Sequence, residues 1–197
     1  MPKVTDEHRA ARRHQVLAAA LRCVSREGFH KTTMAHVIAE SGMSAGAVYG
    51  YFKGKNEIIR AIADFAIGGL AVSLQELAEG DEPVTPADAL AVVLNHVEGL
   101  AESPDGDLTR VAVQAWAEAC RDEQVREIAR QRLLKVRGGW EAVLVRAQRD
   151  GSLHPDADPT QVAQAMIGMM PGFVLQRLIV GDVTAASYLA GFRSVVA

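Results

Sequence analysis

The chain has 197 residues, of which 23% are charged and 49% are hydrophobic, and its formal net charge at pH 7 is −3. This is the composition of an ordinary globular protein and excludes the disordered and fibrous classes. No stretch reaches the roughly 18 consecutive apolar residues of a membrane span, and the start, MPKVTDEHRAARR, lacks a signal-peptide core. We therefore expect a cytoplasmic protein that does not associate with a membrane.

Cys23 and Cys120 are too few and too far apart for a disulfide framework. Both lie among apolar residues at helical spacing, which favours buried, reduced thiols over a redox pair. Reduced thiols agree with a location inside the cell.

The charges are unevenly distributed along the chain. Residues 1–60 carry ten Lys and Arg against five acidic residues, a net charge of +5, and residues 61–197 carry 11 against 19, a net charge of −8. A basic segment joined to an acidic one is typical of a DNA-binding domain attached to a body that does not bind DNA. A chance imbalance of solvated faces is the alternative.

Apolar residues at helical spacing predict helices along the whole chain. The first is expected from about Arg9 to Glu27, with Gly28 as its stop. No segment alternates apolar and polar residues with the period of a strand, so we predict an all-α fold. After the short helices described below, further helices are expected over about 55–79, 86–102 and 108–120. A long helix should then follow an interruption near 121–122 and run to about 150, and the last two are expected over 159–180 and 184–196.

Two short helices joined by a tight turn are predicted within the basic segment. Thr33 can cap the first, and Gly42 can take the left-handed conformation that ends it. Ser44 can cap the second helix, whose buried face is formed by Val48 and Phe52 at i and i+4. Such a pair is a helix-turn-helix, and its second helix enters the major groove of DNA.

These residues resemble the TetR family of bacterial transcriptional regulators. The resemblance rests on GMSAGAVYGYFKGKNEI from Gly42 to Ile58, on RHQVLAAA from Arg13 to Ala20, and on Glu27-Gly28-Phe29 followed by Thr32-Thr33. It covers about the first sixty residues, and the remainder matches the family only in length and helical layout.

The resemblance implies an N-terminal three-helix helix-turn-helix DNA-binding domain over 1–54 and a larger helical ligand-binding and dimerisation domain over 55–197. It also implies a homodimeric repressor that leaves a palindromic double-stranded DNA operator when a small effector binds. We expect the effector to be apolar or aromatic. The helix over 55–79 would connect the two domains, so its tilt would transmit the effect of the ligand.

The DNA contacts are expected from the recognition helix, the caps around it, the start of the next helix and the first turns of the chain. Here the sequence departs from the commoner family pattern, because Ala45 and Ala47 cannot form bidentate hydrogen bonds with bases. Specificity would then rest on few base contacts and on DNA shape. The predicted DNA-binding residues are Thr33, Ser44, Ala45, Gly46, Ala47, Tyr49, Tyr51, Lys53, Lys55, Arg9 and Arg13.

The body is expected to hold a ligand pocket and a dimer seam, although plain core is the alternative for both sets of residues. A helix rich in small residues and Met, near the end of the chain, suits a tight four-helix seam. The pocket candidates are Phe65, His96, Gln114, Trp116, Trp140, Met166 and Met169. The seam candidates are Ala163, Ile167, Met170, Val174, Leu178, Tyr188 and Phe192.

Enzyme chemistry has little support in the sequence. There is no Gly-rich phosphate loop, no metal-ligand spacing of Cys or His, and no nucleophile with neighbouring acid–base partners. We therefore expect no catalytic residues, no metal and no cofactor. The alternative function is a helical protein that binds small molecules or partners and has only non-specific affinity for DNA.

Overall fold

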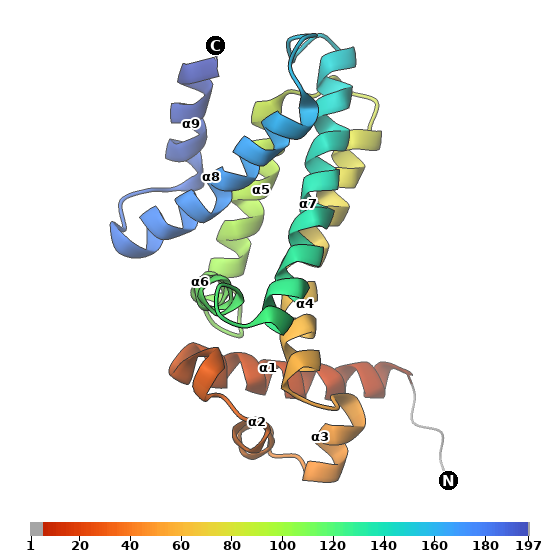
Figure 1. Cartoon of the computed structure of the whole chain (residues 1–197), viewed down its shortest axis with the longest axis vertical. Helices are drawn as coiled ribbons and strands as arrows, with labels where there is room; N and C mark the ends of the chain where they lie inside the picture. Colours follow the sequence, from red (N-terminus) through yellow and green to blue (C-terminus); the bar gives the residue numbers. More distant parts are fainter. Residues whose placement is uncertain (1–5, 197) are drawn as a thin grey trace. The chain divides into compact units, whose positions relative to one another are not determined.

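The computed structural model describes residues 6–196, and within that range it contains nine α-helices and no strand (Figure 1). The all-α prediction is confirmed, and most helix ends lie within one or two residues of their predicted positions. The helices are α1 (Asp6–Lys31), α2 (Met34–Ser41), α3 (Ala45–Tyr51), α4 (Lys55–Glu79), α5 (Pro86–Ala101), α6 (Leu108–Ala119), α7 (Glu123–Arg149), α8 (Pro159–Ile179) and α9 (Ala185–Val196).

Contacts divide the chain into two compact units. The first unit comprises the residues up to 64 together with 103–129, so it holds α1, α2, α3 and α6 and the first parts of α4 and α7. The second unit comprises residues 65–102 and those from 130 onward. The functional division into domains over 1–54 and 55–197 is a different kind of boundary and stays a prediction.

Helix α1 is the scaffold of the first unit and packs against α2, α3 and α6. The apolar side of α1 is buried, with Leu21 and Val24 no more than 2% exposed. Gly28 stops the long helical segment of α1, as predicted: its φ of 82° and ψ of 163° are non-helical, so the chain kinks there before a short second segment that ends at Lys31. This backbone region is essentially restricted to glycine.

A network of charges connects α1 to α2. Arg22 donates from Nε to Oε1 of Glu40 at 2.8 Å, and Arg26 reaches the other oxygen of Glu40 at 3.3 Å. The hydrogen bond from Arg22, with Arg26 assisting, lowers the pKa of the Glu40 carboxyl. His36 of α2 lies 3.0 Å from Oε2 of Glu27 on α1. The network fixes the position of α2 on α1.

The two cysteines differ in their environment. Cys23 is fully buried in the first unit, as predicted, and burial raises the pKa of its thiol. The prediction for Cys120 was wrong, because this residue lies at the C-terminal cap of α6, where the chain turns, and is exposed. Both thiols are free.

The second unit has a core built from one side of α5 together with residues of α4, α7 and α8. Leu90 and Leu94 of α5, Leu74 of α4 and Trp140 of α7 are each no more than 1% exposed. Phe65 of α4, one of the pocket candidates, lies outside this core, because its side chain is 42% exposed. At about 100° per residue it lies well around the helix from the buried Leu70 and Leu74.

Arg146 of α7 binds the end of α4 within the second unit. Its side chain is only 5% exposed. Nη1 donates to the carbonyl oxygen of Leu77 at 2.9 Å, Nη2 donates to that of Glu82, and Nε lies 3.3 Å from Oδ2 of Asp150. The guanidinium therefore satisfies a carbonyl in the last turn of α4, where a positive charge also complements the helix dipole.

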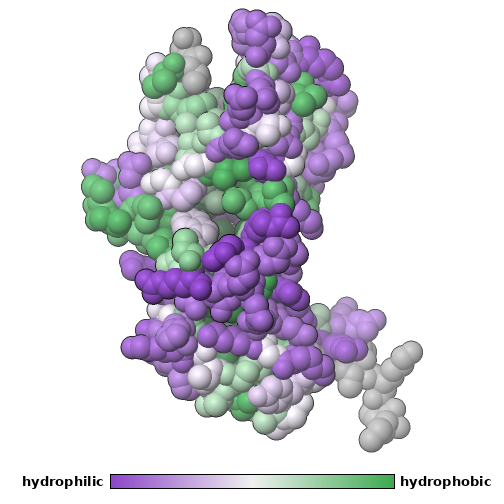
Figure 2. All heavy atoms as spheres, viewed as in Figure 1, coloured by the Kyte–Doolittle hydropathy of each residue, from purple (hydrophilic) through white to green (hydrophobic). Residues whose placement is uncertain are grey.

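Helix α8 is the one helix of residues 6–196 that is long and apolar enough to cross a membrane by composition, with a mean hydropathy of 1.3. The prediction that no run of consecutive apolar residues reaches the length of a membrane span is not affected, because Gln164 and Gln176 interrupt the apolar residues of this helix. One side of α8 is buried in its own chain through Ala163, Met166 and Phe173. Much of the helix stays open, and Figure 2 shows apolar surface gathered at its C-terminal end.

Helix α9 is held on α5 and α8 by polar contacts. Glu98 of α5 accepts a hydrogen bond from the backbone N–H of Ala185 at 2.7 Å. Tyr188 donates to the carbonyl oxygen of Met169 at 3.3 Å, and its ring meets Phe173 edge-on with centroids 5.4 Å apart. These contacts fix α9 at its first turns.

We expect Arg146→Met to lower the free energy of unfolding by about 2–3 kcal/mol, because two carbonyl groups and Asp150 lose a charged hydrogen-bond donor. Chemical denaturation measures the change. Arg149→Met is the matched control: its side chain is 74% exposed, so a change below about 0.5 kcal/mol is expected. Equal losses in the two variants would show that the buried guanidinium has no special role.

We expect Glu40→Gln to lower the midpoint of thermal unfolding at pH 7 and to have less effect in acid. Because folding lowers the pKa of Glu40, the carboxylate stabilises the fold at pH values above the pKa that Glu40 has in the unfolded chain. That contribution is lost as the pH falls through the folded pKa. Glu76→Gln, at an exposed position of α4, is the control. If the midpoints of the wild type and Glu40→Gln differ by the same amount at neutral and acid pH, the stabilising role of the Glu40 carboxylate is contradicted.

Candidate DNA-binding site

The turn between α2 and α3 has the geometry that the sequence predicts. Oγ1 of Thr33 accepts from the N–H of His36, and Oγ of Ser44 accepts from the N–H of Ala47, each at 3.3 Å. Gly42 takes a left-handed conformation, with φ of 66° and ψ of 14°. The helix-turn-helix is therefore built from two side-chain caps and one glycine turn.

Helix α3 has one buried side and one open side. Val48 and the following Phe52 are no more than 1% exposed, so they anchor the helix. Ala45, Gly46 and Tyr49 are exposed, with Tyr49 at 43%, while Ala47 and Tyr51 are half-buried. The open side presents methyl groups, backbone and tyrosine rings, which can contact thymine methyls and phosphates.

Two lysines follow α3. Nζ of Lys53 donates to the carbonyl oxygen of Tyr49 at 3.0 Å, while its backbone N–H donates to Oε2 of Glu57 at 2.7 Å. Lys53 therefore caps the end of α3. Lys55 is the first residue of α4 and is half-buried, so its charge adds to the positive end of that helix.

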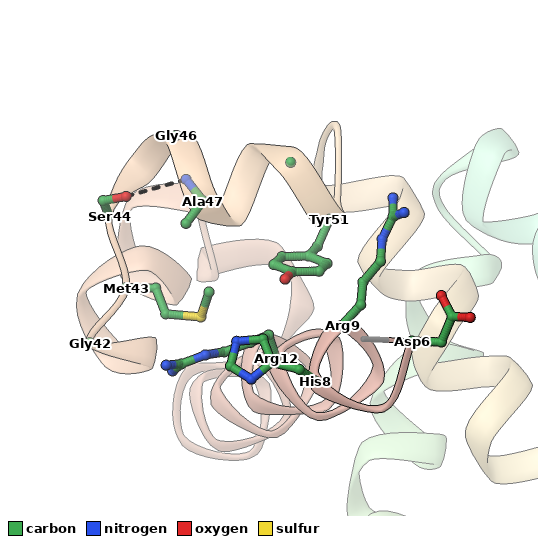
Figure 3. Close-up of a pocket in the computed structure, with 11 residues that line it drawn as sticks. Asp6, His8, Arg9, Arg12, Gly42, Met43, Ser44, Gly46, Ala47 and Tyr51 are labelled. Atoms are coloured by element: carbon green, nitrogen blue, oxygen red, sulfur yellow. Dashed lines mark hydrogen bonds between the residues drawn. The ribbon is translucent and has the colours of Figure 1, made fainter. Parts of the chain in front are cut away.

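A groove of about 870 Å³ lies within the first unit, between the first turns of α1 and the α2–α3 turn. In Figure 3, Arg12 extends toward Met43 at the turn, and Arg9 extends beside Tyr51. The groove is lined by some of the predicted DNA-binding residues and by others that were not in that prediction. Its lining residues are Asp6, His8, Arg9, Arg12, Gly42, Met43, Ser44, Gly46, Ala47, Gly50 and Tyr51.

Arg13, which we expected to contact DNA, is directed at the end of α3. Its guanidinium carbon lies 4.8 Å from the centroid of the Phe52 ring, within the range of a cation–π contact. Arg12, on the same turns of α1, lines the groove, and a DNA contact by Arg13 stays a prediction. The spacing held no signal for this difference, because Arg12 at i+3 and Arg13 at i+4 from Arg9 both share its side of α1.

The expected pocket residues fall into both units. Gln114 and Trp116 belong to the first, and the others belong to the second. Oε1 of Gln114 is buried and has no hydrogen-bond partner among the described residues. Nε2 of His96 lies 2.7 Å from the carbonyl oxygen of Ala66. Trp140 and Met166 are buried as core, whereas Trp116 and Met169 are half-buried.

The expected seam residues also differ in exposure. Ala163 and Val174 are no more than 2% exposed, so they pack inside their own chain. Their prediction as seam residues is therefore corrected. Helical spacing identified an apolar side of α8 but not the partner that covers it. Ile167, Met170, Leu178, Tyr188 and Phe192 are half-buried. The more exposed apolar residues of α8 are Leu175 and Ile179, at 40% and 77%.

The site holds a DNA-binding motif and shows no arrangement for metal chemistry. Among the described residues, no group of three or more His, Cys, Asp or Glu is placed to hold a metal ion.

Two family models match the chain. Residues 16–62 match the model of "bacterial regulatory proteins, tetR family", and residues 100–197 match that of "BetI-type transcriptional repressor, C-terminal". The first match contains the helix-turn-helix described above, and the second begins in α5 and runs through α9.

Relatives agree over nearly the whole length. The HTH-type transcriptional regulator YfiR of Bacillus subtilis is 30% identical over 178 residues, which are 90% of this chain and 85% of that protein. Salmonella enterica GusR has a TM-score of 0.78 at 22% identity, covering 98% and 96% of the two chains. The SmeT–triclosan complex has a TM-score of 0.76 at 23% identity, covering 92% and 91%. The chain therefore belongs to the TetR family of bacterial regulators, and it is a helix-turn-helix DNA-binding transcriptional regulator and not an enzyme.

Proposed function

We propose that this protein is a homodimeric repressor that binds a palindromic operator in the bacterial cytoplasm and leaves it when a small apolar or aromatic molecule binds to its body. The observation that carries the proposal is the capped helix-turn-helix, whose α3 exposes one side beside a groove lined by Arg9 and Arg12. The functional domains would be residues 1–54 and 55–197.

The DNA part of the proposal divides the contacts into two kinds. Ala45, Ala47 and Tyr49 of α3 would meet base edges, and the basic residues around them would meet phosphates. Because the alanines offer only methyl groups, few bases would be read by hydrogen bonds, and DNA shape would supply the remaining specificity. Two copies of α3 would enter major grooves about 34–36 Å apart.

The homodimer is supported by the surface of α8. Ile179 and Val180 at its end are 77% and 64% exposed, and Leu175 is 40% exposed. Burying such side chains stabilises an interface by the hydrophobic effect. Pairing of α8 and α9 with the same helices of a second copy would cover these residues in a four-helix seam.

The ligand response is supported by a contact inside the second unit. The carbonyl oxygen of Ala66 can only accept, so His96 of α5 donates from Nε2 to α4 at 2.7 Å. A molecule that binds beside α5 and competes for His96 would release this connection to α4. Binding would then shift the population away from the DNA-competent form. Met169 is half-buried and suits an apolar or aromatic ligand, the class to which the triclosan bound by the structural relative SmeT belongs.

Selection of random-sequence duplexes by the purified protein at about 150 mM salt tests the proposal. A palindromic consensus bound by two chains would support the repressor, and that duplex could then be used to screen for the effector. Binding that is indifferent to sequence and fades as the salt concentration rises would favour the alternative of an interaction or small-molecule-binding protein.

We expect Lys55→Ala to weaken binding equally on all DNA sequences and to lower the salt slope by about 1 for each bound chain, because one phosphate contact is lost. Fluorescence anisotropy between 50 and 200 mM salt gives the slope. Lys135→Ala, at an exposed position of α7 in the second unit, is the control. An unchanged slope would remove Lys55 from the set of DNA contacts.

We expect Ile179→Glu to weaken the dimer at least about tenfold, since it places a charge in an apolar seam. Sedimentation velocity over a range of protein concentrations measures the change, and operator affinity should fall with it. Val72→Glu is the matched control, because Val72 of α4 is 56% exposed. A dimer that is unaffected by Ile179→Glu would exclude this end of α8 from the seam.

A further inference from the structure

Arg12 is held in place by a chain of hydrogen bonds that begins at the end of α2. The carbonyl oxygen of Ser41, the last residue of α2, accepts from Nε2 of Gln15 at 2.9 Å. Oε1 of Gln15 in turn accepts from Nη1 of Arg12 at 2.9 Å. Gln15 is half-buried and Ser41 is buried, whereas Arg12 is exposed.

This chain of bonds has a fixed direction. The carbonyl of Ser41 can only accept and the guanidinium can only donate, so the Gln15 amide must present its NH₂ group to the first and its oxygen to the second. The carbonyl belongs to the negative end of the α2 dipole, which favours a cation nearby. Gln15 therefore connects the end of α2 to one donor of Arg12 and leaves the other donors of the guanidinium available.

The free donors of Arg12 lie at the groove. Arg9 and Arg12 share one side of α1 at i and i+3, a spacing of roughly 5–6 Å between Cβ atoms. In Figure 3 they extend toward opposite ends of the groove, Arg12 to the turn at Met43 and Arg9 to Tyr51. One strand of a duplex carries a phosphate about every 3.4 Å of helix axis, so a strand along the groove offers phosphates to both guanidinium groups.

We propose that the groove between α1 and the α2–α3 turn receives the backbone of one DNA strand, with Arg12 as a phosphate contact and Gln15 as the residue that positions it. This inference rests on the proposed function, because it names the DNA group that the site binds. Arg13 is not part of this groove lining, and its guanidinium lies over the Phe52 ring at the end of α3.

The role of Gln15 follows from the flexibility of arginine. A free Arg side chain samples many rotamers, and each must be given up when it binds a phosphate. A guanidinium already held by Gln15 loses less freedom on binding, so the complex is stronger for the same contact. Removing the Gln15 amide should therefore weaken DNA binding only while Arg12 is present.

A double-mutant cycle tests this dependence on the duplex obtained by selection. The proteins are the wild type, Arg12→Ala, Gln15→Met and the double variant, and anisotropy from 50 to 200 mM salt gives affinity and salt slope. We expect Arg12→Ala to lower the slope by about 1 per chain and Gln15→Met to weaken binding about threefold to tenfold. The double variant should bind no more weakly than Arg12→Ala alone.

Two further variants serve as controls. Arg121→Ala removes a charge from an exposed position of the same unit outside the groove, and it should leave the slope unchanged. Arg12→Lys keeps the charge but not the fork that binds both Gln15 and a phosphate, so the slope should stay while affinity falls. Thermal unfolding of each variant reports whether α1 and α2 still pack together.

The outcomes separate the inference from the proposed function. A wild type that enriches no sequence would overturn the proposed function, and the inference with it. Specific binding with equal effects of Gln15→Met in the presence and absence of Arg12 would overturn only the positioning role. An Arg12→Ala variant with the wild-type slope would overturn the phosphate contact. If Gln15→Met unfolds the protein, Arg12→Lys still decides, because unchanged affinity would show that the fork is not used.

Discussion

The recognition helix depends on the surface of α1 beneath it. With seven residues, α3 is far below the length at which an isolated helix is stable in water. Its position comes from outside: Ser44 caps its start, Val48 and Phe52 are buried, and Arg13 lies over the Phe52 ring. The charge network around Glu40 fixes α2 on the same helix. A change in α1 therefore alters what α3 presents to DNA.

The caps and turns of this motif could be predicted from sequence because each depends on one residue and its neighbours. Thr33, Gly42 and Ser44 have the predicted roles. The choice between Arg12 and Arg13 depends on rotamers and on the position of Phe52, which adjacent residues in a sequence do not reveal. The same holds for α8, since apolar spacing does not say whether Val174 meets its own chain or another.

When a recognition helix has small side chains, DNA specificity depends more on the residues around that helix. Methyl groups discriminate bases weakly, so in the proposed complex the path of the DNA backbone would supply part of the specificity. The more rigidly the protein holds that path, the better it distinguishes duplexes that bend differently. In this protein the rigid parts are the packing of α1 on α2 and the buried residues that anchor α3. Neither part is placed to contact DNA bases.

The contrast between the two cysteines makes the natural chain convenient for spectroscopy. Cys120 is exposed at the end of α6, while Cys23 is fully buried and burial raises its thiol pKa, so a maleimide reagent should modify the first and spare the second. A spin label or fluorophore could thus be attached without any substitution. In a symmetric pair of chains, two such labels would form a molecular ruler, and their separation could be followed as DNA or effector is added.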